Sequence, residues 1–161
     1  MGEKAMVLFS GGIDSTTCLA LAIEKYGKEN VIPLSVFYGQ KHEKEIEAAS
    51  LALSLDCQVI YYGAHMDDAA GNAYPDCSQA FYDSMNQAVW EGSGKALRIE
   101  APFINPNKAQ IVARGLELKA PYQFTWSCYE GKERPCGVCG TCIDRRKAFE
   151  ANGIKDPALG E

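Results

Sequence analysis

The chain has 161 residues, of which 47% are hydrophobic and 23% are charged, and these values fit a single globular domain over residues 1–161. Its formal net charge of −5 gives no general attraction for the nucleic-acid backbone, which normally requires a basic face, so we expect small-molecule partners rather than nucleic acid. The first twenty residues hold one apolar run, Ala5–Phe9, which is too short for a signal core or a membrane span. We therefore expect a cytoplasmic protein without membrane attachment.

The first third of the chain predicts a strand, a glycine turn and a helix, followed by a second strand and a second helix. Residues 4–9 form an apolar run typical of a strand that is buried on both faces of a parallel sheet. The next helix is predicted to stop at Gly27. Its apolar stripe consists of Leu19, Ala22, Ile23 and Tyr26. Residues 31–37 predict the second strand despite Pro33, and residues 43–55 the second helix.

The rest of the chain continues this alternation. The predicted elements are a strand at residues 59–62, a turn-rich loop at 71–76, a helix ending near Gly92, a strand at 97–99 and a helix at 107–119. Such alternation favours an α/β fold with a Rossmann-like parallel sheet.

Residues 10–15, Ser-Gly-Gly-Ile-Asp-Ser, lie where the first strand should pass into the first helix. Backbone N–H groups and the helix dipole converge on an anion at such a place, and the two glycines let the main chain approach a phosphate closely. The alternative is a plain tight turn in which Asp14 or Ser15 caps the helix. A Walker A loop is excluded because the Gly-Lys-Ser/Thr ending is missing, and the dinucleotide-binding G-x-G-x-x-G pattern is absent too.

Four cysteines near the C-terminus follow a C-x7-C-x2-C-x2-C spacing: Cys128, Cys136, Cys139 and Cys142. Zn²⁺ takes four thiolates in a tetrahedron, and two C-x2-C steps let one tight turn deliver three of them. The same residues could form two disulfides in a secreted protein, but metal ligation is the better interpretation in a reducing cytosol. We therefore expect a structural zinc-binding segment over about residues 125–150.

The hexapeptide at residues 10–15 resembles the PP-loop of the N-type ATP pyrophosphatases. These enzymes have an adenine nucleotide alpha hydrolase-like fold, cleave ATP between the α- and β-phosphates and transfer AMP to an acceptor oxygen. Within that superfamily the chain resembles the QueC family of queuosine biosynthesis. Four blocks carry the resemblance in the family's order: Phe9–Leu19, Tyr38–His42, Tyr74–Cys77, and the block from Thr125 through the four cysteines.

The resemblance implies a ligase that makes 7-cyano-7-deazaguanine from 7-carboxy-7-deazaguanine, ammonia and ATP. The carboxylate would be adenylated, ammonia would displace AMP to give an amide, and a second adenylation would drive dehydration to the nitrile. The resemblance also implies ATP with Mg²⁺, a structural Zn²⁺ and a homodimer. Two other interpretations stay open: another PP-loop adenylase that acts on a deazapurine in a nucleic-acid modification or defence pathway, and a non-catalytic relative that binds zinc and nucleotide.

Matching positions supply the candidate site residues. The ATP-binding candidates are Phe9, Ser10, Gly11, Gly12, Ile13, Asp14, Ser15, Thr16, Thr17, Tyr38, Gly39 and Gln40. The catalytic candidates are Ser10, Asp14, Ser15 and Lys108, and the substrate-binding candidates are Tyr74, Pro75, Asp76 and Cys77. Lys108 could equally be a solvated residue in the first turn of a helix. Of the two histidines, His42 is a weak site candidate, and His65 is interpreted as a surface or packing residue.

Family members are longer by about one α/β unit, and the resemblance places the gap between Ile60 and Tyr61. The family segment there would supply an arginine near the nucleotide and part of the cover of the sheet. Two explanations stay open: a natural or engineered internal deletion, or a disordered stretch omitted from the sequence. A true deletion is expected to weaken catalysis severely, unless a partner in a dimer compensates for it.

Overall fold

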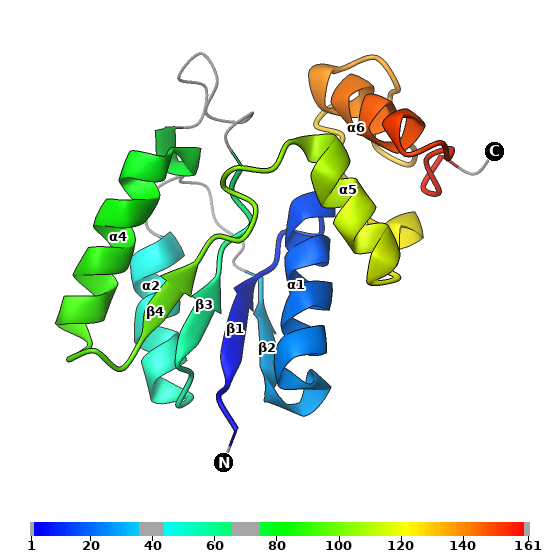
Figure 1. Cartoon of the computed structure of the whole chain (residues 1–161). Coiled ribbons are helices and arrows are strands. Elements are labelled where there is room, and N and C mark those ends of the chain that lie inside the picture. Colours follow the sequence, from blue (N-terminus) through cyan, green and yellow to red (C-terminus); the bar gives the residue numbers. More distant parts are fainter. Residues whose placement is uncertain (1, 36–43, 66–74, 160–161) are drawn as a thin grey trace.

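The computed structural model describes residues 2–35, 44–65 and 75–159, with the side chains of the second helix described from residue 48 onward. Strands and helices alternate along these residues (Figure 1). The strands are β1 Ala5–Leu8, β2 Val31–Leu34, β3 Val59–Tyr61 and β4 Arg98–Glu100. The helices are α1 Ile13–Tyr26, α2 Lys44–Ser54, α4 Gln79–Gly92, α5 Lys108–Glu117 and α6 Gly140–Ala151. Short 3₁₀ turns lie at η1 Lys28–Asn30, η3 Pro75–Cys77 and η4 Tyr122–Phe124.

The described strands form one parallel sheet in the order β2-β1-β3-β4, which confirms the predicted α/β fold with a Rossmann-like sheet. From β1 the chain moves to β2 on one side and then returns to β3 on the other side. Open α/β sheets bind ligands at such a reversal, beyond the carboxyl ends of the strands. The order of the strands therefore places a ligand crevice between the ends of β1 and β3.

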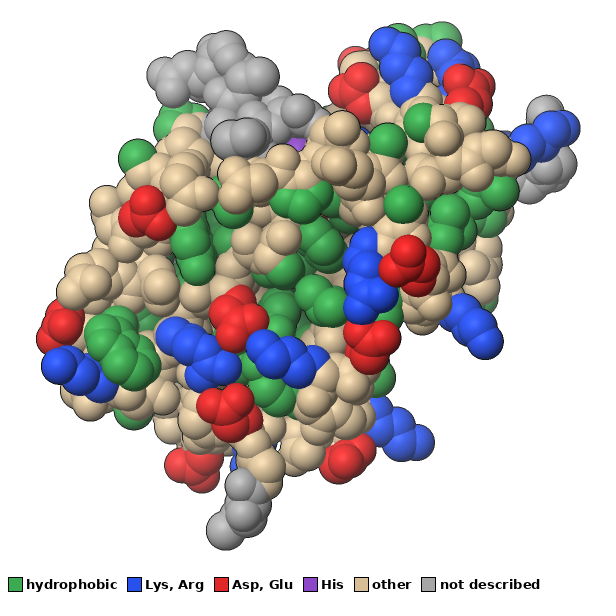
Figure 2. Space-filling model, viewed as in Figure 1, with side chains coloured by type: hydrophobic (Ala, Val, Ile, Leu, Met, Phe, Trp, Pro, Cys, Tyr) green, Lys and Arg blue, Asp and Glu red, His purple; other side chains and the backbone are tan. Residues whose placement is uncertain are grey.

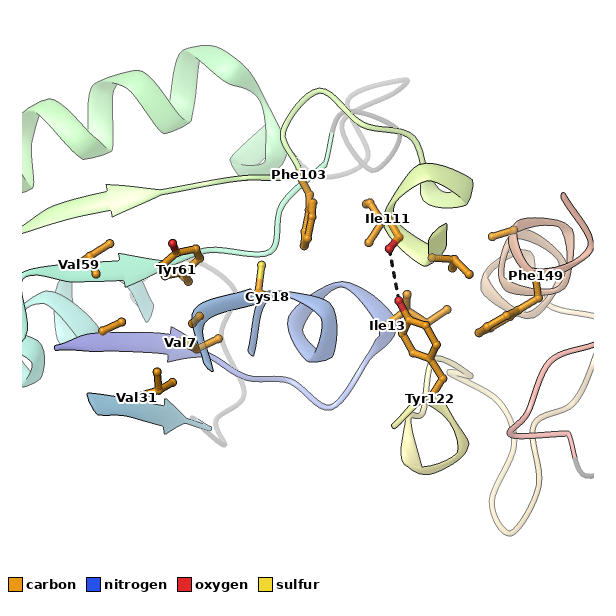
Figure 3. Packing of buried hydrophobic residues seen from close by; sticks show 14 residues of the cluster. Val7, Ile13, Cys18, Val31, Val59, Tyr61, Phe103, Ile111, Tyr122 and Phe149 are labelled. Atoms are coloured by element: carbon orange, nitrogen blue, oxygen red, sulfur yellow. Dashed lines mark hydrogen bonds between the residues drawn. The ribbon is translucent and has the colours of Figure 1, made fainter. Parts of the chain in front are cut away.

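Both faces of β1 are buried, as its apolar run predicts. Val7 belongs to a core shared with α1 and α5, whereas Met6 belongs to a second core shared with α2. Figure 3 shows the first core, in which Val31, Val7 and Val59 come from the neighbouring strands β2, β1 and β3. Ile60 and Tyr61, between which the family gap was expected, are consecutive residues of β3 and enter opposite cores.

Pro33 is compatible with β2 because β2 is the outer strand of the described sheet. The backbone N–H of Phe9 donates to the carbonyl of Leu34 at 2.8 Å, so the peptide groups of Leu34 face β1 and those of Pro33 face the outer edge. The missing N–H of Pro33 therefore costs no hydrogen bond to β1. The remainder of the strand predicted at residues 31–37 includes Phe37, which lies outside the described residues.

The structure confirms the helix predicted at residues 107–119 as α5 and adds one helix that was not predicted. Asn107 caps α5 through a reciprocal capping box with Gln110. The additional helix is α6, whose first turn contains the last cysteine of the metal motif. Its buried positions are Cys142, Arg145, Ala148 and Phe149. Because one of these positions is an arginine, the apolar stripe that would indicate a helix is interrupted.

Gly115 of α5 lies against the hydroxyl group of Tyr122, which is hydrogen-bonded to Thr17 Oγ1 of α1 at 2.7 Å. A Cβ at position 115 would overlap that hydroxyl group. We therefore expect Gly115→Ala to lower the free energy of unfolding by about 2–4 kcal/mol through overpacking and loss of the buried hydrogen bond. Thermal and urea unfolding measure the loss.

The matched control is Gly92→Ala, because Gly92 is also helical and a Cβ there would contact nothing within 4 Å. This control should keep or slightly raise the stability. Equal melting temperatures for the two variants would contradict the packing described at Gly115.

Candidate functional site

The predicted phosphate loop links β1 to α1 and presents the N-terminus of that helix. Gly11 has a φ angle of +81°, a conformation that favours glycine, and its carbonyl accepts a hydrogen bond from the N–H of Trp126 at 3.0 Å. The N-cap is Gly12, and no side chain of the described residues caps the helix there. The proposed capping by Asp14 or Ser15 is therefore not observed. The first backbone N–H groups of α1 remain available to an anion.

A cavity of about 970 Å³ lies at this loop, at the carboxyl ends of β1 and β3. Residues from the first turns of three helices line it: Ile13 of α1, Lys108 of α5 and Thr141 of α6. Each helix N-terminus carries a partial positive charge, and each effect is strongest within the first turn. The electrostatic environment of the cavity therefore suits a polyanion such as a triphosphate.

The cavity brings together many, but not all, of the candidate residues. The ATP-binding candidates that line it are Phe9, Ser10, Gly12, Ile13, Asp14 and Ser15, and Lys108 and Cys77 line it as well. Gly11, Pro75 and Asp76 are not among the lining residues, and Thr16 and Thr17 are buried within α1. The candidates that lie outside the described residues are Tyr38, Gly39, Gln40, His42 and Tyr74.

Three polar side chains from separate elements meet at the cavity wall. The Nζ atom of Lys108 donates to Oδ2 of Asp14 at 2.6 Å and lies 3.0 Å from Nε2 of His65. Burial raises the pKa of the Asp14 carboxyl, but the charge and the hydrogen bond of Lys108 outweigh it and hold that pKa below its ordinary value. Asp14 is therefore a carboxylate at neutral pH. Its second oxygen, Oδ1, is buried and accepts no hydrogen bond from the described residues.

His65 belongs to this group although it was interpreted as a surface or packing residue. Its side chain is only 2% exposed, and it lines the cavity. A usable signal was its position just after β3, at the carboxyl end of a strand next to β1. That signal required the strand order, which the sequence pattern alone does not supply.

The four C-terminal cysteines form a cluster that fits a tetrahedral metal ion. Their Sγ atoms all lie within 4.8 Å of one another, and the Cys128–Cys139 and Cys136–Cys142 Sγ pairs are 3.9 and 4.0 Å apart. Four thiolates bonded to Zn²⁺ at about 2.3 Å would be separated by about 3.8 Å. The cluster could therefore hold a metal ion with little movement, as its spacing predicted.

Hydrogen bonds around the cluster favour thiolates at some positions. The N–H groups of Cys136 and Gly131 donate to Sγ of Cys128 and lower the pKa of that thiol. Thr141 and the backbone of Cys142 lower the pKa of Cys139 to about 6. Burial raises the pKa of Cys142 to about 12, so this thiol stays protonated unless a cation compensates for its charge. A divalent metal ion would supply that compensation.

A buried arginine attaches the cysteine segment to the rest of the fold. Arg145 of α6 forms a two-pronged ion pair with Asp156, with N···O distances of 2.5 and 2.8 Å, and its guanidinium donates to Thr125 Oγ1 at 2.7 Å. Four residues that follow Thr125 line the cavity: Trp126, Ser127, Cys128 and Tyr129. The cysteine cluster and Arg145 therefore hold one wall of the phosphate-loop cavity.

One face of the molecule carries mixed charges. On the face seen in Figure 2, Lys and Arg side chains lie next to Asp and Glu side chains. Ion pairs between partly exposed side chains include Lys25–Glu100 and Arg114–Glu24. Such alternation does not form the basic stripe that a nucleic-acid backbone requires. Among the described residues, no helix is both long enough and apolar enough to span a membrane.

Comparisons with known proteins agree on one family. A family model described as queuosine biosynthesis protein QueC matches residues 4–54 and 47–153. A 7-cyano-7-deazaguanine synthase of Archaeoglobus fulgidus is 34% identical to this chain, covering 98% of the chain and 90% of the relative. Its counterpart in Caldicellulosiruptor bescii is 32% identical, covering 96% of each, and 7-cyano-7-deazaguanine synthase 1 of Colwellia psychrerythraea is 32% identical, covering 98% of each.

The alignments are longer than the chain itself. The alignment with the A. fulgidus relative extends over 220 positions, whereas the chain has 161 residues. The relatives therefore have residues for which this chain has no counterpart, although nearly the whole chain is matched. With matches over almost all of its length, the chain belongs to the family of the queuosine biosynthesis protein QueC.

Proposed function

We propose that this chain is an ATP-dependent synthase that converts 7-carboxy-7-deazaguanine and ammonia into 7-cyano-7-deazaguanine. The relatives bear the name of that activity. The observation that carries the proposal is the cavity in which an uncapped helix N-terminus, the loop Ser10–Ser15 and the Lys108 ammonium face one space. This arrangement is suited to binding a triphosphate and to stabilising the charge that develops during phosphoryl or adenylyl transfer.

The reaction follows from the poor leaving group of a carboxylate. The carboxylate oxygen of the substrate attacks the α-phosphorus of ATP, the bond to the β-phosphate oxygen breaks, and pyrophosphate leaves. Ammonia then attacks the acyl carbon of the adenylate and loses one proton, and AMP leaves with the electrons of the acyl–oxygen bond, which gives the amide. A second ATP adenylates the amide oxygen and releases pyrophosphate, and loss of AMP and of both protons on nitrogen gives the nitrile.

Four residues of the cavity are assigned to this chemistry in the proposal. Ser10 and Ser15, whose Oγ atoms lie 3.2 Å apart, bind phosphate oxygens together with the backbone N–H groups of α1. Lys108 stabilises the negative charge on the transferred phosphate. Asp14 orients Lys108 and is the residue proposed to interact with hydrated Mg²⁺ or pyrophosphate. When bound with ATP, Mg²⁺ would neutralise phosphate charge.

Other parts of the proposal rest on the family resemblance. Tyr38, Gly39 and Gln40 are proposed to contact ATP, and Tyr74, Pro75, Asp76 and Cys77 to contact the deazapurine. Of these, Cys77 lines the cavity. Zn²⁺ in the cysteine cluster is proposed to be structural, because its four ligands leave no open coordination position. A cytoplasmic homodimer is also proposed.

The point at which the family unit is missing from this chain is proposed to lie within α2. Residues 47–54 match the family model twice, once at the end of the first segment and once at the start of the second. A helix joined from parts of two family helices would give this double match. The gap between Ile60 and Tyr61 stays a prediction, but the double match favours the join in α2.

A join in α2 leaves the described residues of the cavity in place. One further strand–helix unit after β2 would extend the order 2-1-3-4 to 3-2-1-4-5, so its strand would lie beyond β2. That position is at the edge away from the crevice between β1 and β3. Retained activity in the shorter chain is therefore structurally reasonable.

The proposal is tested by measuring AMP and pyrophosphate release from ATP with and without 7-carboxy-7-deazaguanine. We expect AMP formation only when the deazapurine acid is present. AMP formation with another acceptor but not with this acid would support a different PP-loop adenylase. ATP binding without any AMP formation would support a non-catalytic relative.

A further inference from the structure

His65 lies on a loop that is packed directly against the phosphate loop. A Cβ at Gly63 would lie 3.3 Å from the carbonyl carbon of Asp14, so the two loops are in close contact. Ala64 is buried in a small apolar cluster with Ala101 and Ile104. The backbone at Gly63 and Ala64, just before His65, is therefore held in place by packing, which restricts the position of His65.

Lys108 occupies a position that is electrostatically unfavourable for a cation. It is the first residue of α5, and the positive end of the helix dipole disfavours a positive charge there. The ammonium group is accommodated because it pairs with Asp14 and contacts His65. A lysine side chain has a flexible four-carbon stem, so one ion pair alone allows several placements of the charge.

We propose that His65 is a positioning residue for Lys108. Its neutral Nε2 accepts a hydrogen bond from the ammonium group of Lys108 and holds that group beside the phosphate loop. An ammonium group has donors only, so Nε2 must be unprotonated and the ring proton must lie on Nδ1. Nε2 also faces Oδ2 of Asp14, but at 3.6 Å, which is too long for a hydrogen bond to that carboxylate. Because the imidazole is neutral, it directs the charge of Lys108 without cancelling it. The role of Lys108 rests on the proposed function, whereas the hydrogen bond itself does not.

Kinetics of two variants test the positioning role. His65→Leu keeps an apolar side chain in the buried site but removes the acceptor, and we expect kcat for AMP formation to fall about 10- to 100-fold with KM for ATP changed less than about threefold. His65→Gln offers an oxygen acceptor in a similar place and should recover most of that loss. If Gln were no better than Leu at equal melting temperature, packing alone would explain His65 and the proposal would be wrong.

A double-mutant comparison separates positioning from a general structural effect. In a Lys108→Met background there is no ammonium group to position, so adding His65→Leu should change the remaining rate by less than about threefold. The same fold loss in both backgrounds would contradict the proposal.

A tautomer measurement tests the hydrogen bond even if the protein forms no AMP. Long-range ¹H–¹⁵N NMR can resolve the rings, because the chain has only 2 histidines. We expect one ring to show the neutral Nδ1–H form at neutral pH and to lose that preference in Lys108→Met. The signal that is absent from His65→Gln is the signal of His65. An Nε2–H or doubly protonated His65 would overturn the proposal independently of the activity.

Discussion

Lys108→Met is expected to lower the rate of AMP formation about 100- to 1,000-fold, which is the usual cost of removing one donor that stabilises transition-state charge. Methionine keeps much of the length and apolar character of the lysine stem but cannot donate to a phosphate. The Nζ atom of Lys108 is also the partner of Asp14 at 2.6 Å, so the variant leaves a carboxylate without its countercharge. Steady-state kinetics with saturating deazapurine acid measure the effect.

The matched control for Lys108→Met is Lys25→Met. Lys25 is also paired with a carboxylate, that of Glu100 at 3.3 Å, but its side chain is 49% exposed and it lies in the last turn of α1. An exposed pair contributes about 0–1 kcal/mol to stability, so this control should fold normally. Its rate of AMP formation should lie within about twofold of that of the unmodified chain, because Lys25 is far from the cavity lining. Equal rates of AMP formation for the two variants would show that Lys108 does not take part in the chemistry.

Cys136→Ser is expected to abolish stoichiometric zinc binding and to lower both the melting temperature and the activity. Binding of structural Zn²⁺ to short cysteine-containing peptides contributes about 10–16 kcal/mol, and much of this would be lost with one of the four ligands. The segment between Cys128 and Cys142 has little other regular structure before α6 begins. Trp126, Ser127 and Tyr129 of the cysteine segment line the cavity. Loss of order in this segment should therefore also lower the rate of AMP formation.

Elemental analysis by mass spectrometry measures the zinc content, and thermal unfolding measures the melting temperature. Cys57→Ala is the control, since Cys57 is buried at 2% exposure in the core beside α2, outside the cysteine cluster. It should keep one zinc per chain and lose only the modest stability expected for a small core change. A Cys136→Ser protein with full zinc content and an unchanged melting temperature would show that the cluster is not a four-cysteine metal site.

Local patterns in the sequence were sufficient to predict most of the fold. The apolar run at residues 4–9 and the stripe ending at Gly27 predicted β1 and α1, and both are observed within one or two residues of the expected bounds. Gly27 has a φ angle of +81° at the end of α1, which is the physical reason why glycine marks that end. The cysteine spacing likewise predicted a compact cluster, because short steps in sequence limit the distances between the thiols.

Features that depend on tertiary packing were not predictable in this way. His65 enters the site through the order of the strands, and the sequence pattern showed that strands alternate with helices without showing which strands are neighbours. Helix α6 was missed because Arg145 occupies a buried position, where it is stabilised by Asp156 on a later turn. In both cases a polar residue is buried by partners that are distant in sequence.

The central claim is that this 161-residue chain carries out the whole conversion of the acid to the nitrile. The most direct test is mass spectrometry of the products formed from ATP, Mg²⁺, ammonia and 7-carboxy-7-deazaguanine by the zinc-containing protein. We predict AMP and 7-cyano-7-deazaguanine together, in a ratio of about two to one, because each nitrile requires two adenylation steps. Formation of AMP without any nitrile, or of neither product by folded protein that binds ATP and zinc, would contradict the account.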